Sequence, residues 1–244
     1  MEQNNKCEHC GKAFEKKTAG IGDLKKEYFI PVCDCIEKQE VKEQKIQKEQ
    51  DLAKRIIKSG ISKRYLDKTL YNFKVFKDRN DKAHNYCWEY VKNYKTMIPK
   101  GEGLLFFGSV GTGKTHLANA LAQELIRNEV NVLVINAPSF FNDLKKSIQK
   151  NEPLHLFELA KTSQVLFVDD IGKEKPTAWV MESIYDIINH RYNEMKPIIF
   201  TTNAKDEQEL TENVTYPVMS RINEMCKSAE VKGRIGKEDY RRQS

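Results

Sequence analysis

The chain lacks any apolar stretch that approaches the roughly 20 residues of a membrane-spanning helix. Its first residues, 1–7, also lack the apolar region of a secretory signal. Of its residues, 39% are hydrophobic and 31% are charged, so a buried core can form inside a highly charged surface. These features exclude a membrane protein and predict a cytoplasmic one, in which thiols remain reduced.

The positive charge is small in sum but uneven along the chain. There are 41 Lys and Arg against 35 Asp and Glu, a net charge of +6. Residues 59–100 hold 10 of the basic and 4 of the acidic residues, so the remainder is neutral at 31 against 31. This segment is either a solvated lysine-rich surface or a contact for an anionic partner such as nucleic acid. Charge alone leaves both alternatives open.

Cysteine is scarce outside residues 1–36, which hold four of the six. C-x-x-C and C-x-C pairs separated by a loop are typical of structural zinc, with no open coordination position. Such a metal replaces a core that is too small to fold alone. His9 is an alternative ligand, since C-x-C is the less usual half-site, and four unrelated thiols are the other alternative. The predicted zinc ligands are Cys7, Cys10, Cys33 and Cys35.

Residues 37–58 contain neither proline nor glycine and are rich in Glu, Lys and Gln. This composition predicts an exposed helical linker, because its apolar residues are too sparse for a coiled coil. Ser59-Gly60 ends the linker. We therefore expect a zinc-binding module at 1–36, the linker at 37–58 and a larger domain at 59–244.

A glycine-punctuated loop organises the larger domain. Apolar residues at 103–107 run into G-x-x-x-x-G-K-T from Gly108, the spacing of a phosphate-binding P-loop. Its glycines let backbone N–H groups surround a polyphosphate, Lys114 can reach the β- and γ-phosphates, and Thr115 can bind Mg²⁺. A chance match in a flexible turn is the alternative. The residues predicted to bind the nucleotide here are Gly108, Gly111, Thr112, Gly113, Lys114, Thr115 and His116.

Short apolar segments alternate with helical patterns after the P-loop. This alternation predicts an α/β fold with a parallel, doubly wound sheet whose ligand end lies beyond the carboxyl ends of the strands. The expected strands are the apolar stretch 103–107 before the P-loop, 130–135, 165–170 and 198–203, and the expected helices are 81–95, 116–127, 139–150, 154–160 and 179–192.

Polar side chains stand at two of these strand ends. Asp169 and Asp170 follow a buried strand, and Asn203 ends another. We expect Asp169 to hold Mg²⁺ and Asp170 to orient or deprotonate the attacking water. Asn203 would polarise that water or sense the γ-phosphate. The alternatives are an exposed acidic pair and an ordinary asparagine in a turn.

The order of these motifs resembles AAA+ ATPases, and among them the DnaC/DnaI-type replicative helicase loaders, with IstB-like transposition helper ATPases as near relatives. The resemblance covers about residue 59 to the C-terminus, and the cysteine pairs resemble the zinc-binding module of DnaI-like loaders. The matching segments are GSVGTGKT from Gly108, Asp169-Asp170-Ile171-Gly172, Ile188-Asn189-His190-Arg191-Tyr192, Phe200-Thr201-Thr202-Asn203, Ser220-Arg221-Ile222 and Asp239-Tyr240-Arg241.

The resemblance implies roles for several further residues. Asn203 is similar to the sensor 1 residue, Arg221 to the arginine finger that reaches a neighbouring subunit's ATP, and Arg241 to sensor 2. A surface salt bridge is the alternative for each arginine. Arg191 also matches the family pattern, but the resemblance gives it no role.

The segment 140–150 lies where loaders and initiators carry an extra helical element that is similar to one contacting single-stranded DNA. The resemblance places Lys145, Lys146, Thr177 and Trp179 near such a strand, with lysines for phosphates and an aromatic ring for a base. Core packing is the equal alternative for Trp179.

Two features depart from the broad AAA+ pattern. Only 41 residues follow Asn203, too few for the usual helical lid but in keeping with loaders. Asp170 stands where many AAA+ enzymes have Glu, and its shorter side chain predicts slow turnover.

Together these features predict an ATP-dependent loader of a hexameric replicative helicase that uses ATP, Mg²⁺ and Zn²⁺. We expect it to bind single-stranded DNA, to self-associate through the ATP site and to have no membrane partner. The alternatives are a transposition helper ATPase and an adaptor that binds ATP but hardly hydrolyses it.

Overall fold

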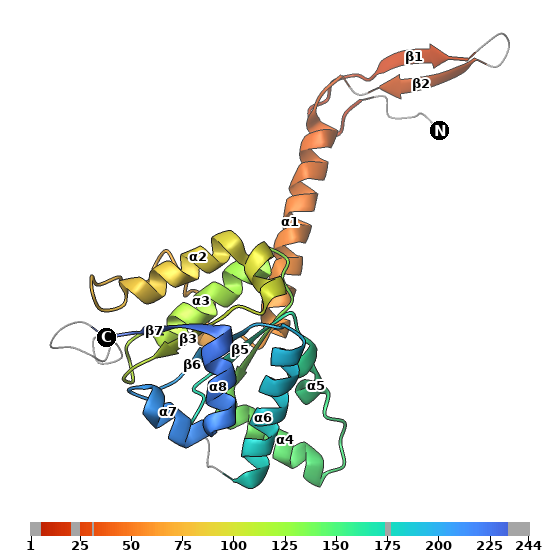
Figure 1. Ribbon diagram of the computed structural model, residues 1–244. Helices are drawn as coiled ribbons and strands as arrows, with labels where there is room; N and C mark the ends of the chain where they lie inside the picture. Colours follow the sequence, from red (N-terminus) through yellow and green to blue (C-terminus); the bar gives the residue numbers. More distant parts are fainter. Residues whose placement is uncertain (1–5, 21–24, 31, 174–176, 234–244) are drawn as a thin grey trace. The chain divides into compact units, whose positions relative to one another are not determined.

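The computed structural model describes residues 6–20, 25–30, 32–173 and 177–233 (Figure 1). The chain forms two compact units, Met1–Lys54 and Arg55–Ser244. None of the helices in the described ranges has both the length and the apolar character that crossing a bilayer requires.

The first unit is a small antiparallel hairpin followed by a long helix. Strands β1 (Glu15–Ala19) and β2 (Lys26–Ile30) pair with Glu15 opposite Ile30. Helix α1 (Cys35–Lys58) then runs on into the second unit. All five residues of β1 are exposed, so the hairpin has no hydrophobic core that could hold it by burial alone.

The second unit is built on a five-stranded sheet in the order β4-β5-β6-β3-β7, with all neighbours parallel. This confirms the predicted α/β class. The strands are β3 (Gly103–Phe107), β4 (Val132–Asn136), β5 (Val165–Asp169), β6 (Ile198–Thr201) and β7 (Cys226–Glu230). The sequence did not predict β7, an edge strand on which only Ala229 is fully buried.

Helices cover both faces of this sheet. Figure 1 shows α2 and α3 on one face and α6 and α8 on the other. The helices are α2 (Asp81–Met97), α3 (Lys114–Arg127), α4 (Ala137–Gln149), α5 (His155–Thr162), α6 (Ala178–Asn193), α7 (Glu207–Val214) and α8 (Tyr216–Met225), with short 3-10 turns at Lys63–Tyr65 and Ile98–Lys100. Strand side chains such as Leu105, Leu166 and Phe200 pack in one core with α4, α6, α7 and α8.

Helices α7 and α8 belong to the same core as the sheet. After β6, α7 and α8 bury Leu210, Val214 and Ile222 in the main core. They therefore complete the sheet's covering layer and form no separate helical domain.

The structure gives a role to Arg191, for which the sequence offered none. Its side chain is fully buried on α6 and donates to the carbonyl oxygens of Ala160, Ser163 and Pro197 at 2.9, 2.9 and 2.8 Å. Burial lowers the pKa of Arg191 to about 9, so the guanidinium remains charged at neutral pH. One side chain thus joins the end of α5, the start of β5 and the start of β6.

The segment before the first 3-10 turn closes the β4 edge of the sheet. The Val134 N–H donates to the Ser59 carbonyl at 2.6 Å. Gly60 has a φ of +89°, and a Cβ added there would lie 2.3 Å from the Val134 carbonyl oxygen. Only glycine fits this close approach of the two backbones.

Candidate functional site

The P-loop between β3 and α3 depends on glycine at two close contacts. Gly108 has a φ of +131°, and an added Cβ would lie 2.7 Å from the Val231 carbonyl oxygen. Gly113 has a φ of +102°, and an added Cβ would lie 2.8 Å from Cε2 of Phe73. A side chain at either position would push the loop away from its neighbours.

Lys114 begins α3 and lies inside the loop. Its side chain is buried, and Nζ donates to the carbonyls of Gly108 and Ser109 at 2.7 and 2.8 Å. The loop is therefore wrapped around its own cation, at the positive end of a helix. This arrangement favours an anion such as a nucleotide phosphate.

Asp169, the last residue of β5, is the hub of the predicted metal site. Its Oδ1 accepts from the hydroxyls of Thr115 at 2.8 Å and Thr201 at 2.6 Å. Burial raises the pKa of Asp169, and the bonds from the two threonines oppose this shift. One carboxylate and one hydroxyl are oxygen donors of the kind that Mg²⁺ prefers, so Thr115 and Asp169 fit this ion. Bound there, it would neutralise charge on the phosphate oxygens.

Asp170 lies next to Asp169, and each oxygen of its carboxylate has a polar partner. Asn203 donates to Oδ1 at 2.8 Å, and Lys173 Nζ lies 3.4 Å from Oδ2. Its φ is +61°, a left-handed conformation that Asp tolerates but seldom adopts. Its N–H donates to the Thr201 hydroxyl at 3.0 Å, which fixes the turn. The structure thus places Asp169, Asp170 and Asn203 together, as the strand order predicted.

A cavity of about 490 Å³ opens over these residues. The P-loop, Asp170, Asn203 and Lys173 form part of its lining. The rest comes from a segment before α2, which the sequence did not assign to this site: Arg64, Tyr65, Lys68, Asn72, Phe73 and Lys74. The signal was the basic excess before the P-loop. Part of that charge faces the cavity, where it complements a polyphosphate.

His116 lines the same cavity, as expected of a nucleotide-site residue, but its ring also contacts the preceding segment. Its Nε2 lies 3.0 Å from the Thr69 carbonyl oxygen, and the ring meets Phe73 edge-on at 5.1 Å between centroids. Burial lowers the pKa of His116. The ring therefore helps to hold residues 69–73 against α3.

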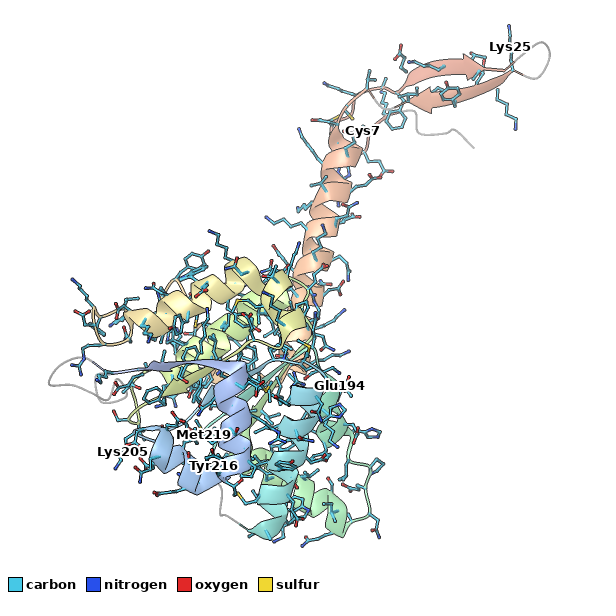
Figure 2. All side chains as sticks on the ribbon, in the orientation of Figure 1. Cys7, Lys25, Glu194, Lys205, Tyr216 and Met219 are labelled. Carbon is cyan, nitrogen blue, oxygen red and sulfur yellow. The ribbon has the colours of Figure 1, made fainter. Side chains whose placement is uncertain are left out.

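Arg221 lies on α8, which Figure 2 marks by the labels on Tyr216 and Met219. Among the described residues that line the nucleotide cavity it does not appear. Its guanidinium donates to Asn189 at 3.0 Å and to the Tyr185 hydroxyl at 3.1 Å. The Tyr185 and Tyr192 rings lie 4.9 and 5.6 Å from its Cζ. Arg241 lies outside the described residues.

A second cavity, of about 660 Å³, lies between α4 and the start of α6. It brings together Lys145, Thr177 and Trp179, three of the four residues predicted near DNA. The fourth, Lys146, is not among the described lining residues and pairs with Asp143 at 3.0 Å. Thr177 also caps α6 by accepting from the Val180 N–H at 3.3 Å. Trp179 packs partly against the core and also borders the groove, so core packing accounts for part of its side chain and contact with DNA stays a prediction.

The four predicted zinc ligands converge in the first unit. The sulfurs of Cys7, Cys10, Cys33 and Cys35 all lie within 4.8 Å of one another. Four thiolates around zinc need sulfurs about 3.8 Å apart, so a small adjustment suffices. Backbone N–H groups of Cys10 and His9 lower the pKa of Cys7 to about 6, whereas hydrogen bonds with the thiols of Cys10 and Cys33 raise the pKa of Cys35 to about 12, so the first thiolate of the cluster forms at Cys7. The His9 side chain is exposed and is outside this group in the described chain.

We expect a Cys7→Ser/Cys10→Ser variant to lose its zinc, because two of four ligands are gone. Elemental analysis of the purified chain measures this directly. The second unit has its own core, so its free energy of unfolding, measured in urea, should stay within about 0.5 kcal/mol of the wild type. Unchanged zinc content would remove these cysteines from the site.

The P-loop, the paired aspartates at a strand end and the parallel sheet define a P-loop nucleotide-binding protein. The bacterial DnaA ATPase domain matches residues 66–225, more than half of the chain, and the chain belongs to this family of AAA+ ATPases.

Relatives extend this result and confirm the predicted resemblance. The chain is 27% identical to the replicative helicase loader DnaI of Bacillus subtilis, over 96% of this chain and 75% of that protein. The crystal structure of the DnaC helicase loader superposes with a TM-score of 0.65, at 28% identity, over 70% of this chain and 100% of that one. The crystal structure of DnaI gives 0.63, at 28% identity, over 72% and 93%. These similarities support a role in replication initiation.

Proposed function

We propose that the protein is an ATP-dependent loader of the replicative DNA helicase and works in the cytosol. The observation that carries this proposal is the similarity to a helicase loader over 96% of the chain. That similarity spans both units, and therefore the cysteine cluster as well as the ATPase site. In this proposal the first unit binds a hexameric helicase, and ATP hydrolysis in the second unit sets when the helicase is released.

The geometry around Asp170 supports hydrolysis of ATP at the cavity. A water positioned by Asn203 and Asp170 attacks the γ-phosphorus, and the bond to the bridging oxygen of ADP breaks. The carboxylate of Asp170 takes the proton of that water. The positive lining, including Lys114 and Lys68, stabilises the negative charge on the phosphate oxygens.

We propose further that Arg221 acts on the ATP of a neighbouring copy. Its position on α8, away from the cavity lining of its own chain, fits a role in a neighbour's site. Asn189 and Tyr185 hold its guanidinium in one orientation, which lowers the entropy lost when it contacts a phosphate. A finger supplied in this way makes hydrolysis depend on assembly.

An Arg221→Ala variant should retain ATP binding. The part of its hydrolysis rate that rises with protein concentration should be at least tenfold lower than in the wild type. Tenfold corresponds to about 1.4 kcal/mol of transition-state stabilisation. Hydrolysis measured across a protein dilution series tests this expectation, with Arg127→Ala as a surface control. Full concentration-dependent activity in Arg221→Ala would leave the arginine with a structural role only.

The groove between α4 and α6 supports binding of single-stranded DNA. Trp179 offers an aromatic face for a base, and Lys145 offers a charge for a phosphate. The lining is mainly apolar, with Phe141 and Ile148 beside Trp179, which suits unpaired bases better than a duplex backbone.

The decisive experiment for the proposed function is co-purification of the full chain with the replicative helicase of its own host. We expect a stable complex for the wild type and at least tenfold weaker binding for Cys7→Ser/Cys10→Ser, because the first unit would lose two of the four cysteines of its cluster. Binding to a transposase in place of the helicase would favour a transposition helper. A helicase complex without measurable single-turnover hydrolysis would favour an ATP-binding adaptor.

A further inference from the structure

Lys173 borders both cavities of the second unit. It follows the turn that carries Asp170, and its side chain lines the nucleotide cavity as well as the groove of Lys145 and Trp179. Within the described chain, Lys173 is the one residue that lines both cavities. A single charged side chain therefore stands between the predicted hydrolytic centre and the predicted strand-binding groove.

We propose that Lys173 couples the two sites: it restrains Asp170 while the groove is empty and transfers to a backbone phosphate when a single strand enters. This inference rests on the proposed function, because it takes Asp170 as the base and the groove as the strand site. It adds a positioning residue and a direction of control, in which nucleic acid starts hydrolysis.

The restraint follows from the contacts of the Asp170 carboxylate. Asn203 occupies Oδ1 at 2.8 Å, and Lys173 lies beside Oδ2 at 3.4 Å. A water that is to lose a proton to this carboxylate needs a place at one of these oxygens. While Lys173 stays at Oδ2, an attacking water must compete with a cation for that place.

The release follows from the exposure and the strength of the same ion pair. The Lys173 side chain is 62% exposed and the pair is long, so water screens it and little holds it closed. A phosphate of a bound strand offers Lys173 shorter, charge-assisted hydrogen bonds. Lys145 on α4 supplies a second positive charge to the same groove, so the strand arrives where Lys173 can reach it.

Single-turnover ATP hydrolysis by the full chain, with and without a thymidine oligonucleotide, tests this coupling. The wild type should be stimulated several-fold by the oligonucleotide. Lys173→Gln should hydrolyse ATP without oligonucleotide at close to the stimulated wild-type rate, and should gain less than twofold on its addition. Lys173→Arg keeps the charge and should behave as the wild type. Lys205→Gln removes an exposed lysine outside both described linings and should leave both rates unchanged.

Two outcomes overturn the coupling. An unstimulated rate for Lys173→Gln at or below that of the wild type would show that Lys173 does not restrain Asp170. Equal stimulation of Lys173→Gln and the wild type would show that release does not pass through Lys173. Fluorescence anisotropy of a labelled oligonucleotide separates these outcomes from failure of the proposed function. A wild type that binds no strand, at low salt as well as at physiological salt, refutes strand binding in the groove and with it the release of Lys173. The unstimulated rates of the wild type and Lys173→Gln still decide whether Lys173 restrains Asp170.

Discussion

An Asp170→Asn variant should bind ATP within about threefold of the wild type and hydrolyse it about 10³-fold more slowly, in the range that a positioned general base contributes. The amide has the shape of the carboxylate but cannot take a proton from water. Asparagine also tolerates the left-handed backbone at this position, where φ is +61°, so the turn should survive. Single-turnover hydrolysis and binding of a fluorescent ATP analogue measure the two quantities separately.

Asp169→Asn is the matched comparison, one residue earlier in the same strand end. It should raise the Mg²⁺ concentration needed for half-maximal hydrolysis, since Asp169 pairs with Thr115 at the predicted metal position. Asp169→Asn should therefore mainly raise the Mg²⁺ requirement, whereas Asp170→Asn should mainly lower the rate of hydrolysis. If Asp170→Asn turned over at the wild-type rate, another group would have to be the base.

Replacing Arg191 by alanine should cost the second unit about 4 kcal/mol of its free energy of unfolding. The change leaves the carbonyls of Ala160, Ser163 and Pro197 without their charged donor and opens a cavity under α6. A loss of this size is a large part of the stability of a typical domain. Urea unfolding followed by intrinsic fluorescence measures it.

Two further variants make this result interpretable. Arg127→Ala removes an arginine that forms an ion pair with Glu124 on the surface of α3, and should change stability by less than about 0.5 kcal/mol. Arg191→Lys keeps a charge but not the planar fork, so it should lose less than alanine and remain measurable if alanine prevents folding. Equal stability of all three proteins would show that the buried contacts of Arg191 are dispensable.

The fold was predictable where burial leaves a pattern in the sequence. β5 and β6 are buried along most of their length, so each reads as a continuous apolar run, and α6 between them buries residues at helical spacing, Val180, Ile184, Ile187 and Ile188. β7 was not predicted, because Cys226–Glu230 is an edge strand with exposed polar side chains. Its pairing with β3 is decided by tertiary contacts that no local pattern encodes.

The same contrast applies to the site. Lys114 and Thr115 follow from local spacing, and the meeting of Asp170 with Asn203 follows from the rule that parallel strands end at one edge. The cavity wall from Tyr65 to Lys74 comes from an irregular segment, so no periodicity pointed to it. Arg191 matched the family pattern without a role, and its buried carbonyl partners are what reveal a structural one.

The closed edge of the sheet bears on how copies of this chain can meet. The Val134 N–H already donates to the Ser59 carbonyl, and Gly60 lies against the Val134 carbonyl oxygen. The backbone of a second copy therefore cannot add as a further strand at that point of β4. Growth by strand addition, the route to irreversible aggregates, is blocked there. At this edge, contacts between copies would have to form through side chains, and a single substitution can separate such contacts.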